Sequence, residues 1–522
     1  MRFNILIGGR AGQGINELAT ILARTLGKIG FYTFNYRDYG SLITGGHNFN
    51  IVCVSDKKVG SYDDNVDLVL SLDEKTLEIH KKRFTDKTIF VVNFQTNQKN
   101  SVYLAADRDK TENMAFATAV FKILELDKKH LLDEVKIRFA GKSLLAKDLD
   151  VIDHFYDKDF GYSIKLNHEN TSKVVMNGAE AVSKGVIASD LDVYFAYPMT
   201  PSTTLLNYLA KEQDGNFFVY SPEDEIAVAN AGLGASFAGA RTMVGTSGGG
   251  FDLMTEAMSM QSITELPLVV YLAQRTGPST GVPTYNSQQD LLVSLFGGHG
   301  EGSRVVVAPG SPKECIEKTN EAFYLAEKYG ILSIVLSDKH IAESDFSFNE
   351  FKLKPLNIPK RKLMPGMSNL KFRTSSYEHN SKGDNTEVIE EINESFGKRL
   401  DKDKALEKEA KKFERYKVYG KGKNLIIGFG STKGAILDTL DSLDARFLQI
   451  LYLSPFPKEI SSFIKSSKNV FVVEANASGQ LAKVIAMNTG FVIDDKNKIL
   501  KYDGRPFTPE EIIKEMAKRG VK

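Results

Sequence analysis

The feature of this sequence that most constrains its fold is the repeated alternation of short apolar runs with helical stretches. The run FNILIGG at 3–9 is followed by INELATILARTLGKIG at 15–30, and later by VDLVLSL at 66–72 and TIFVVN at 88–93. Apolar residues in the second of these segments recur with helical spacing. Strands that alternate with helices predict a doubly wound α/β domain, here over residues 1–165.

The same alternation returns in two further blocks of the chain. The block at 172–345 contains strand-like runs such as VYFAY at 193–197 and LPLVVYLAQ at 266–274, which are apolar almost throughout. Runs of this kind are typical of a parallel sheet that is covered on both faces. A third block at 424–522 opens with the strand-like run NLIIGFGS. The sequence therefore predicts an α/β fold of three domains with mostly parallel sheets.

Residues 346–423 differ from these blocks and are predicted to form a connector. Pro355, Pro359 and Pro365 precede a polar, turn-rich stretch. A highly charged run from about 387 to 416 follows, in which apolar residues recur at helical spacing: Ile392, Phe396, Leu406, Ala410 and Phe413. We expect a long amphipathic helix that packs on a neighbour along one stripe.

Charge and cysteine content exclude several classes of function. The net charge is +1, from 67 basic and 66 acidic residues, which leaves no electrostatic footprint for nucleic acid or a membrane surface. With only Cys53 and Cys315, the chain cannot hold a four-thiolate iron–sulfur cluster by itself. No apolar run approaches the roughly 20 residues that span a bilayer. The N-terminus lacks a signal-peptide layout, so we expect a cytoplasmic protein.

Two glycine loops lie in the first block. The loop Gly9–Gly14, read GRAGQG, stands between a strand and a helix, where backbone N–H groups can bind an anion. Its glycine spacing is not that of a dinucleotide-binding fingerprint, and Ile15 occupies the position where a phosphate-binding loop requires Lys. A tight turn without a ligand fits the pattern equally well. The second loop, Thr44–His47, contains Gly45 and Gly46, and its histidine is more typical of a structural role.

In the second block, a YPMTPS motif at 197–202 directly follows an apolar strand. Pro201 suits the first helical position, so Thr200 is expected to cap the helix. This places a hydroxyl and free N–H groups at the carboxyl end of a parallel strand, where open α/β sheets bind ligands. Simple capping without a ligand is the competing interpretation.

Three consecutive acids, Glu223, Asp224 and Glu225, open a helix made almost entirely of small apolar residues. Acids at a helix start usually form a surface charge cluster. A helix of such small residues is expected to be buried, however, and an acid at its start then needs a partner. A ring nitrogen of a ligand would serve as that partner.

Two more loops follow strands of the same block. Gly245–Gly250 contains Thr246 and Ser247 and allows close backbone approach, although it is also compatible with a turn that binds nothing. The loop 274–284 places Arg275 at a strand end beside hydroxyls and glycines. Arginine suits bidentate recognition of a carboxylate, whereas a single arginine in isolation is usually a surface residue. Four such loops at strand ends of one block together favour a binding site.

These motifs resemble those of the 2-oxoacid:ferredoxin oxidoreductases. The resemblance rests on YPMTPS at 197–202, on the helix beginning at Glu225 with GASFAGARTMVGTSGGG, and on QRTGPSTGVPT at 274–284. The segment VVEANASGQLA at 472–482 is similar to the family's following α/β domain. Residues 1–165 look like its gamma-type domain, so the chain resembles a fused gamma–alpha subunit. It departs from the family's loop at Ala11, where a glycine is common.

The resemblance implies an enzyme that decarboxylates a 2-oxoacid oxidatively with coenzyme A, yielding acyl-CoA, carbon dioxide and reduced ferredoxin, in a reaction that can be reversible. 2-Oxoglutarate is the favoured substrate by analogy. Glu225 would be catalytic and would bond the aminopyrimidine of thiamine diphosphate. The remaining roles implied are substrate binding by Thr200, Arg275 and Thr284; cofactor binding by Tyr197, Pro198, Thr246 and Ser247; and coenzyme A binding by Gly12, Gln13, Gly14, Gly45 and Gly46.

The resemblance also implies a partner. A beta subunit would share the thiamine diphosphate and carry its Mg²⁺ and a [4Fe-4S] cluster, in an (alpha-beta)2 assembly that is active only as a complex. This chain itself would bind no metal. Two alternatives are a catalytically inactive paralogue that serves as a binding subunit, and a nucleotide-dependent dehydrogenase using the N-terminal glycine loop. The intact Thr200, Glu225 and Arg275 speak against the first, and the glycine spacing speaks against the second.

Overall fold

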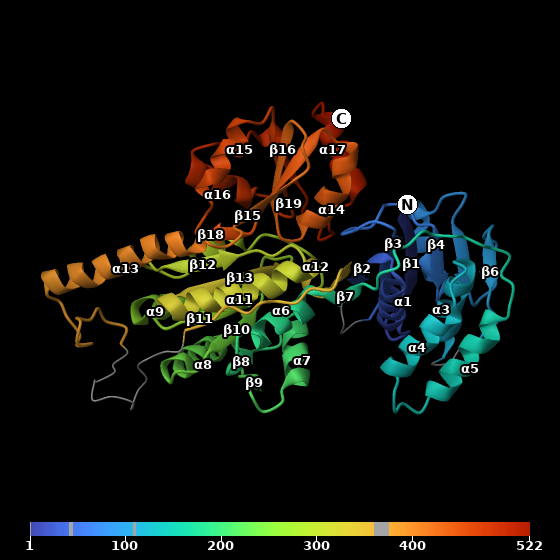
Figure 1. Cartoon of the computed structure of the whole chain (residues 1–522), viewed down its shortest axis with the longest axis horizontal. Helices are drawn as coiled ribbons and strands as arrows, with labels where there is room; N and C mark the ends of the chain where they lie inside the picture. Colours follow the sequence, from blue (N-terminus) through green and yellow to red (C-terminus); the bar gives the residue numbers. More distant parts are fainter. Residues whose placement is uncertain (1, 41–44, 108–110, 360–374, 522) are drawn as a thin grey trace. The chain divides into compact units, whose positions relative to one another are not determined.

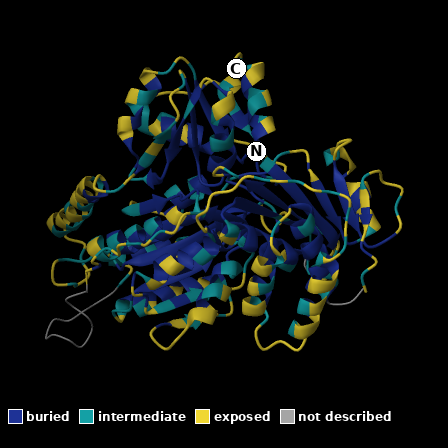
Figure 2. Ribbon diagram, turned by 45° about the vertical axis from the view of Figure 1, so that its right-hand side comes forward, coloured by how far each residue is buried: buried dark blue, intermediate teal, exposed yellow. Residues whose placement is uncertain are grey.

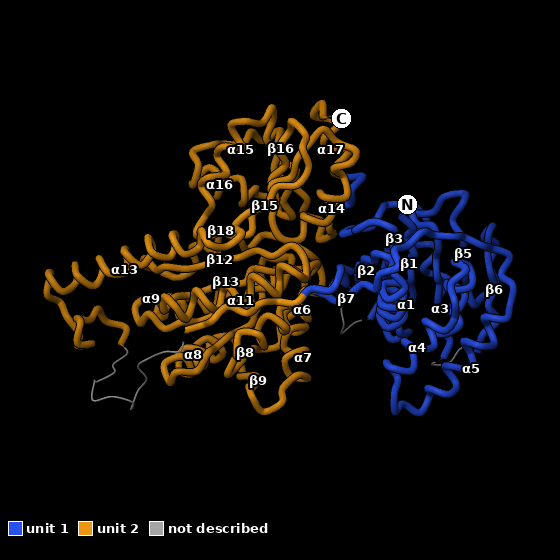
Figure 3. Tube along the Cα trace, viewed as in Figure 1, with its two compact units in different colours: residues 1–177, 344–351, 508–511 blue, residues 178–343, 352–507, 512–522 orange. Residues whose placement is uncertain are grey.

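The structure is a computed structural model that describes residues 2–40, 45–107, 111–359 and 375–521. It contains three sheets of eight, seven and five strands, with helices between the strands along the chain (Figure 1). The predicted α/β class with mostly parallel sheets is confirmed. The chain divides into two compact units, one of residues 1–177, 344–351 and 508–511 and one of the remaining residues (Figure 3).

The first unit is built around the eight-stranded sheet. Its strands are β1 (Arg2–Arg10), β2 (Tyr32–Tyr39), β3 (His47–Ser55), β4 (Leu68–Ser71), β5 (Ile89–Val92), β6 (Ser101–Tyr103), β7 (Val174–Asn177) and β14 (Asp345–Phe348). Its helices are α1 (Ile15–Ile29), α2 (Glu74–Ile79), α3 (Glu112–Ile123), α4 (Lys128–Arg138) and α5 (Leu145–Tyr156). The strand order is β6-β5-β4-β1-β3-β2-β14-β7, parallel from β6 to β1 and antiparallel beyond it.

Residues 174–177 belong to the block predicted at 172–345, yet they form a strand of the first sheet. This strand, β7, pairs antiparallel with β14, which in turn pairs with β2. The sequence boundary at 345 and 346 also falls inside β14. An apolar run predicts that a strand is buried, but it carries no information about which sheet edge accepts it.

The second unit contains the seven-stranded sheet. Its strands are β8 (Val193–Ala196), β9 (Phe218–Tyr220), β10 (Thr242–Thr246), β11 (Leu268–Gln274), β12 (Arg304–Val307), β13 (Leu332–Asp338) and β18 (Tyr452–Ser454). Its helices are α6 (Gly178–Ile187), α7 (Thr203–Glu212), α8 (Glu225–Phe237), α9 (Gly248–Thr264), α10 (Leu291–Phe296), α11 (Pro312–Tyr329) and α12 (Lys339–Glu343). The order is β18-β12-β13-β11-β10-β8-β9, and only the β12–β18 pair is antiparallel.

The central strands of this sheet are fully buried, as their apolar sequences predicted. Every residue of β10, β11 and β13 is buried, and these strands appear dark blue in Figure 2. Helices α8, α9 and α11 pack against them. The sheet therefore forms a rigid base from which the loops at its carboxyl edge extend.

The third sheet and its helices complete the second unit. The strands are β15 (Tyr416–Tyr419), β16 (Asn424–Phe429), β17 (Ala445–Ile450), β19 (Val470–Glu474) and β20 (Lys498–Leu500), in the order β15-β17-β16-β19-β20. The helices are α13 (Ile389–Ala410), α14 (Thr432–Thr439), α15 (Ser461–Lys465), α16 (Gln480–Thr489) and α17 (Pro509–Lys518), and the first residues of α17, up to Glu511, belong to the first unit. One hydrophobic core contains residues of both sheets, including Val306, Leu336, Ile427 and Leu448.

The long helix expected in the connector is present as α13. Its C-terminal end is packed, with Leu406 and Ala410 buried, whereas Phe396 is 41% exposed. The predicted stripe is therefore buried only near its end. Pro365 lies outside the described residues. Across the described part of the chain, the helices are all too short or too polar to cross a membrane.

Candidate active site

The four loops singled out in the second block meet at one edge of the seven-stranded sheet. They directly follow β8, β9, β10 and β11, which are mutually parallel and adjacent in the order β11-β10-β8-β9. Because parallel strands end at the same edge, the loops 197–202, 221–225, 247–250 and 275–284 are brought together.

Glu225 is the first residue of α8, and it is buried. The cap of α8 is Asp224, whose carboxylate accepts a hydrogen bond from Ala227 N at 2.7 Å. Glu225 is 4% exposed, and its Oε1 has no hydrogen-bond partner among the described residues. Leaving a buried carboxylate oxygen unpaired costs about 1–3 kcal/mol or more. The oxygen is thus available to a donor that the chain itself does not supply.

The glycine-rich start of α9 makes room for Glu225. A methyl group added at Gly250 would lie 2.7 Å from Glu225 Cγ and 2.8 Å from its Oε1. Thr246 and Ser247 are buried beside it, and the Ser247 hydroxyl has no partner within the described structure. The space left by Gly250 is occupied by a carboxylate of the same chain, while the approach of a ligand to the loop Gly245–Gly250 stays a prediction.

Arg275 and Thr200 are in direct contact. Arg275 Nη1 donates to the Thr200 carbonyl oxygen at 2.9 Å, across 75 residues of sequence. Arg275 is 9% exposed, and burial lowers its pKa while the charges of Asp290 and Glu225 oppose that shift. Arg275 Nε has no partner in the described part of the chain. The guanidinium is therefore anchored through one nitrogen and retains donors for a further anion.

The expected capping role of Thr200 is wrong. α7 begins at Thr203, and its cap position is Ser202, whose side chain makes no capping hydrogen bond. Thr203 N donates to the Met199 carbonyl at 3.0 Å, so a turn precedes the helix. A Thr-Pro pair suits such a turn as well as a helix start, because proline fixes φ near the value that both require.

The other predicted residues of this block lie around the same loops. Thr284 is buried in the loop after Arg275, which is closed by a bridge between Thr276 and Val282. Tyr197 is 40% exposed, and Pro198 is exposed beside it. Both residues are therefore accessible at the carboxyl end of β8.

A residue that the sequence analysis did not select, Asp290, also reaches this site. It occupies the cap position of α10 without a side-chain capping bond, and a methyl group added at Gly248 would lie 2.7 Å from its Oδ1. Burial and the charge of Asp252 raise the pKa of Asp290 to about 7, against the effect of Arg275. In sequence, an Asp before an apolar run predicts a cap, so nothing marked it as a site residue.

The segment before Asp290 is fixed by the third sheet. Gln288 N donates to the Ala475 carbonyl at 2.7 Å, and Ala475 N donates to Gln288 Oε1 at 3.0 Å. Asn476 Nδ2 donates to the Gln288 carbonyl at 3.0 Å, and Gln480 Nε2 to the Gln289 carbonyl at 2.6 Å. The motif at 472–482 therefore serves to hold the loop that leads from Arg275 to Asp290.

The glycine loops of the first unit contact each other. Ala11 N donates to the Gly46 carbonyl at 3.0 Å, and Gly12 and Gly14 have φ values of 93° and 76°. Gln13 is used within its own loop, because its Oε1 accepts from Arg10 N at 2.6 Å. A cavity of about 910 Å³ is lined by Gly12, Gln13, Gly14, Glu17, Leu72, Glu112, Asn113, Met114, Phe139, Lys142, Ser143, Leu144 and Asp148. Gly45 is described, whereas Thr44 lies outside the described residues.

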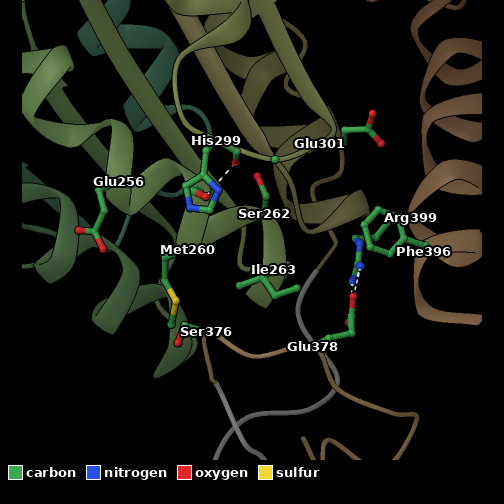
Figure 4. A pocket seen from close by; sticks show the side chains of 12 residues that line it. Glu256, Met260, Ser262, Ile263, His299, Glu301, Ser376, Glu378, Phe396 and Arg399 are labelled. Carbon is green, nitrogen blue, oxygen red and sulfur yellow. Dashed lines mark hydrogen bonds and ion pairs between the residues drawn. The ribbon is translucent and has the colours of Figure 1, made fainter. Parts of the chain in front are cut away.

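Another pocket of the second unit contains none of the predicted site residues. It has a volume of about 240 Å³ and lies between α9, the loop at 299–301 and α13 (Figure 4). Glu378 and Arg399 form an ion pair across it. Among the described residues, no group of three or more His, Cys, Asp or Glu side chains is arranged to hold a metal ion.

Comparison with known families gives two matches along the chain. The model described as pyruvate flavodoxin/ferredoxin oxidoreductase, thiamine diphosphate-binding, matches residues 184–410. The model described as pyruvate ferredoxin/flavodoxin oxidoreductase matches residues 4–158. The first match contains all four loops at the carboxyl edge, and the second contains both glycine loops of the first unit.

Individual relatives extend these matches over the whole length. The 2-oxoacid:ferredoxin oxidoreductase subunit alpha of a Sulfolobus species is 29% identical, covering 99% of this chain and 97% of the relative. The 2-oxoglutarate synthase subunit KorA of Archaeoglobus fulgidus is 31% identical, covering 65% of this chain and 97% of the relative. A solved structure of 2-oxoglutarate:ferredoxin oxidoreductase from Magnetococcus marinus, with 2-oxoglutarate, coenzyme A and succinyl-CoA bound, superposes with a TM-score of 0.89 at 25% identity, covering 99% of each chain.

Proposed function

Because this chain belongs to the 2-oxoacid:ferredoxin oxidoreductases, as an alpha subunit with a thiamine-diphosphate-binding domain, we propose that it takes part in the coenzyme A-dependent oxidation of 2-oxoglutarate by ferredoxin. The observation that carries the proposal is the buried, unpartnered Glu225 beside the anchored Arg275. 2-Oxoglutarate is favoured because relatives and the superposed structure are named for that substrate.

The residues at the carboxyl edge fit thiamine diphosphate. An unpaired Glu225 carboxylate oxygen suits a ring N–H, and the glycines at the start of α9 leave space close to the backbone. When bound, thiamine diphosphate supplies the reactive carbon and the electron sink for decarboxylation. Glu225 would accept and return a proton at a ring nitrogen. Tyr197, Pro198, Thr246 and Ser247 would line the ring.

Arg275 and Thr200 would bind the substrate. The guanidinium keeps unused donors for a carboxylate, and the bond to the Thr200 carbonyl fixes its direction. Holding the carboxylate in one orientation presents the neighbouring ketone to the cofactor in a single geometry. Thr284, buried in the same loop, would limit the size of the pocket.

The proposal includes a beta subunit that carries the Mg²⁺ and a [4Fe-4S] cluster, in a cytoplasmic (alpha-beta)2 assembly. Its support is that this chain has two cysteines, Cys53 and Cys315, both buried, whereas such a cluster takes four thiolates. Coenzyme A would bind at the glycine loops of the first unit, through Gly12, Gln13, Gly14, Gly45 and Gly46. The cavity of about 910 Å³ beside the first of these loops is large enough for part of it.

The test is to co-express this chain with its beta subunit, and to express it alone as the control. We expect the complex to reduce ferredoxin with 2-oxoglutarate and coenzyme A, and the isolated chain to be inactive. Pyruvate and branched 2-oxoacids should give lower kcat/KM. Preference for another 2-oxoacid would replace the substrate assignment, whereas turnover by the isolated chain would overturn the shared site. An assembled, cofactor-loaded complex with no turnover on any 2-oxoacid would identify an inactive binding subunit.

A further inference from the structure

The loop 275–284, which follows β11, has an exposed tip and a fixed base. Residues 278–282 at the tip are exposed, whereas Asn286, next to the base, is buried. Thr276 N donates to the Tyr285 carbonyl at 3.1 Å, and Thr276 Oγ1 donates to the Asn286 carbonyl at 3.0 Å. The two ends of the loop are therefore joined to each other at this base.

The residues paired at the base are direct neighbours of the proposed substrate-binding residues. Thr276 follows Arg275, and Tyr285 follows Thr284. The position of the base therefore decides where the guanidinium and the Thr284 side chain begin. A binding site works only when such residues are held within about 0.5 Å of the productive geometry.

A turn near the end of the chain, at 503–506, packs against this base. Asn286 N donates to the Gly504 carbonyl at 2.9 Å. Gly504 has a φ of 79°, and a methyl group added there would lie 2.9 Å from Tyr285 Cβ. Glycine is required at this position because the backbone approaches the loop closely and adopts a left-handed conformation.

The next residue of the turn, Arg505, places a positive charge over the ring of Tyr285. The carbon atom at the centre of its guanidinium lies 3.8 Å from the ring centroid. A cation over the face of an aromatic ring is attracted by the ring electrons when it lies within roughly 6 Å. Arg505 N donates to Asp503 Oδ1 at 2.9 Å, which holds Arg505 within the turn.

The turn is anchored in the third sheet. Lys501 N donates to the carbonyl of Glu474, in β19, at 3.1 Å, and Lys501 Nζ donates to the Pro506 carbonyl at 3.0 Å. β20, which directly precedes the turn, is the parallel partner of β19. The third sheet thus holds the substrate loop at a second place, separate from the contacts made by 475–480, and both sheets belong to the second unit.

We propose that Arg505 is a positioning residue for the 2-oxoacid. Through the ring of Tyr285 it holds the base of the loop, so that Arg275 and Thr284 face the substrate in one geometry. The inference rests on the proposed function, because it requires a 2-oxoacid at Arg275. Without the contact, the loop is correctly placed in a smaller fraction of the molecules, and the apparent affinity for substrate falls by that fraction.

The test is Arg505→Met in the assembled complex, which removes the charge but keeps a long side chain. We expect KM for the 2-oxoacid to rise by about 3- to 30-fold, within the range that a cation–ring contact allows. At saturating 2-oxoacid, kcat should change by less than about twofold, because bound substrate restores the loop. KM for coenzyme A, proposed to bind in the first unit, should stay unchanged. Arg505→Lys keeps a cation and should recover most of the affinity.

Two further measurements examine the contact itself. If Arg505 acts through Tyr285, the double variant Tyr285→Leu/Arg505→Met should raise KM no more than the more severe single variant does. Hydrogen–deuterium exchange of the segment 275–286, followed by mass spectrometry, should be faster in Arg505→Met. The reason is that the N–H groups of Thr276 and Asn286 are bonded at this base.

Arg446→Met is the matched control, because the Arg446 guanidinium also lies over a ring, 5.9 Å from the centroid of Phe463, and bonds to residues 463–467. It should change neither KM nor exchange in 275–286. Wild-type KM or wild-type exchange in Arg505→Met would overturn the role of Arg505, as would additive effects in the double variant. A wild-type complex that turns over no 2-oxoacid would overturn the proposed function instead, whatever the exchange of the loop.

Discussion

Buried charged side chains in the second unit are of two kinds. Some are fully hydrogen-bonded and hold the fold together, whereas others keep an oxygen that has no partner within the described structure. Glu314 and Lys433 form an ion pair, and Glu314 Oε2 also accepts from Gln449 Nε2 at 2.8 Å and from Gly310 N at 2.9 Å. Lys433 of α14 and Gln449 of β17 thereby join α11 to the third sheet and its helix. Glu225 and Asp290 are equally buried but each keeps an unpaired oxygen within the described structure. Such oxygens are found where a protein awaits a ligand.

Replacing Glu225 by Gln tests the first of these carboxylates. The amide occupies the same space beside Gly250 but cannot accept and return a proton, so turnover should fall on the order of 10²-fold. Hydrogen–deuterium exchange at the reactive carbon of bound thiamine, followed by NMR, should slow in parallel. Glu223→Gln is the matched control, because Glu223 is exposed two residues away. Exchange at the wild-type rate in Glu225→Gln would remove this residue from cofactor activation.

Replacing Arg275 by Lys tests the carboxylate site. Lysine keeps the charge but loses the planar arrangement of donors, one of which holds the Thr200 carbonyl. A charged hydrogen bond contributes about 1.5–3 kcal/mol, so kcat/KM should fall by about 10- to 150-fold. Because the contact at Thr200 is made by its backbone, Thr200→Ala should leave that bond intact and have the smaller effect. Unchanged kcat/KM for all 2-oxoacids in Arg275→Ala would contradict the assignment.

At the scale of single residues, the sequence could predict which side chains belong to the candidate site when their own local segment carries a clear pattern. Arg275 and Glu225 were recognisable because a strand, a loop and a helix start are all marked by local patterns. Asp290 was not, because its place at the site depends on distant Gly248 and Arg275, and its local pattern is that of a helix cap. The predicted cap at Thr200 failed for a related reason, since a turn and a helix start share the same residue preferences.

At the scale of elements, packing around the first turn of α9 explains two of its three glycines, Gly248 and Gly250. Gly250→Ala would bring a methyl group within 2.7 Å of Glu225 Cγ, displacing the carboxylate, so activity should be largely lost while the fold persists. Gly249→Ala is the matched control, because only the Ser279 carbonyl lies near, at 3.7 Å. That substitution should keep activity and stabilise the fold by about 0.4–1 kcal/mol. Kinetics and thermal unfolding of both variants distinguish these outcomes, and equal activity of the two would contradict the packing argument.

The elements themselves were largely predictable, whereas some of their partners were not. Strands β8 and β11 were marked by apolar runs, and the full burial of β11 follows from its central place in the parallel sheet. β7 joins the first sheet through β14, in a register that pairs Val174 with Phe348, 174 residues later and beyond the reach of any local pattern. Pairing over that distance depends on the packing of whole sheets, which single-strand patterns do not encode.

At the scale of the whole molecule, buried histidines are expected to make the protein sensitive to acid. Burial and the charge of Lys339 lower the pKa of His340 to about 3. Burial, together with the charges of His47 and Arg83, lowers the pKa of His80 to about 3 as well. Unfolded histidine titrates near 6.5, so the unfolded state binds an extra proton per residue as the pH falls from about 6.5 towards 3. Each should reduce the free energy of unfolding by up to about 1.4 kcal/mol per pH unit.

Urea denaturation followed by circular dichroism at pH 7, 6 and 5 measures this slope. His340→Gln should flatten the pH dependence of the unit that contains it by up to about 1.4 kcal/mol per pH unit. His130→Gln, at an exposed position, should leave the slope unchanged. An identical slope in wild type and His340→Gln would show that this histidine is not buried in its neutral form.

The hydrogen bonds between Gln288 and Ala475 have a consequence for recombination between relatives. The loop that begins at Arg275 is held by backbone and side-chain groups of a segment 200 residues later in the chain, at 475–480. A chimera that exchanged either segment alone would combine the loop of one relative with the supporting segment of another, and Asp290 would be displaced. Residues 275–292 and 474–480 therefore form one structural unit. Transferring the substrate preference of one relative to another requires that both segments be exchanged together.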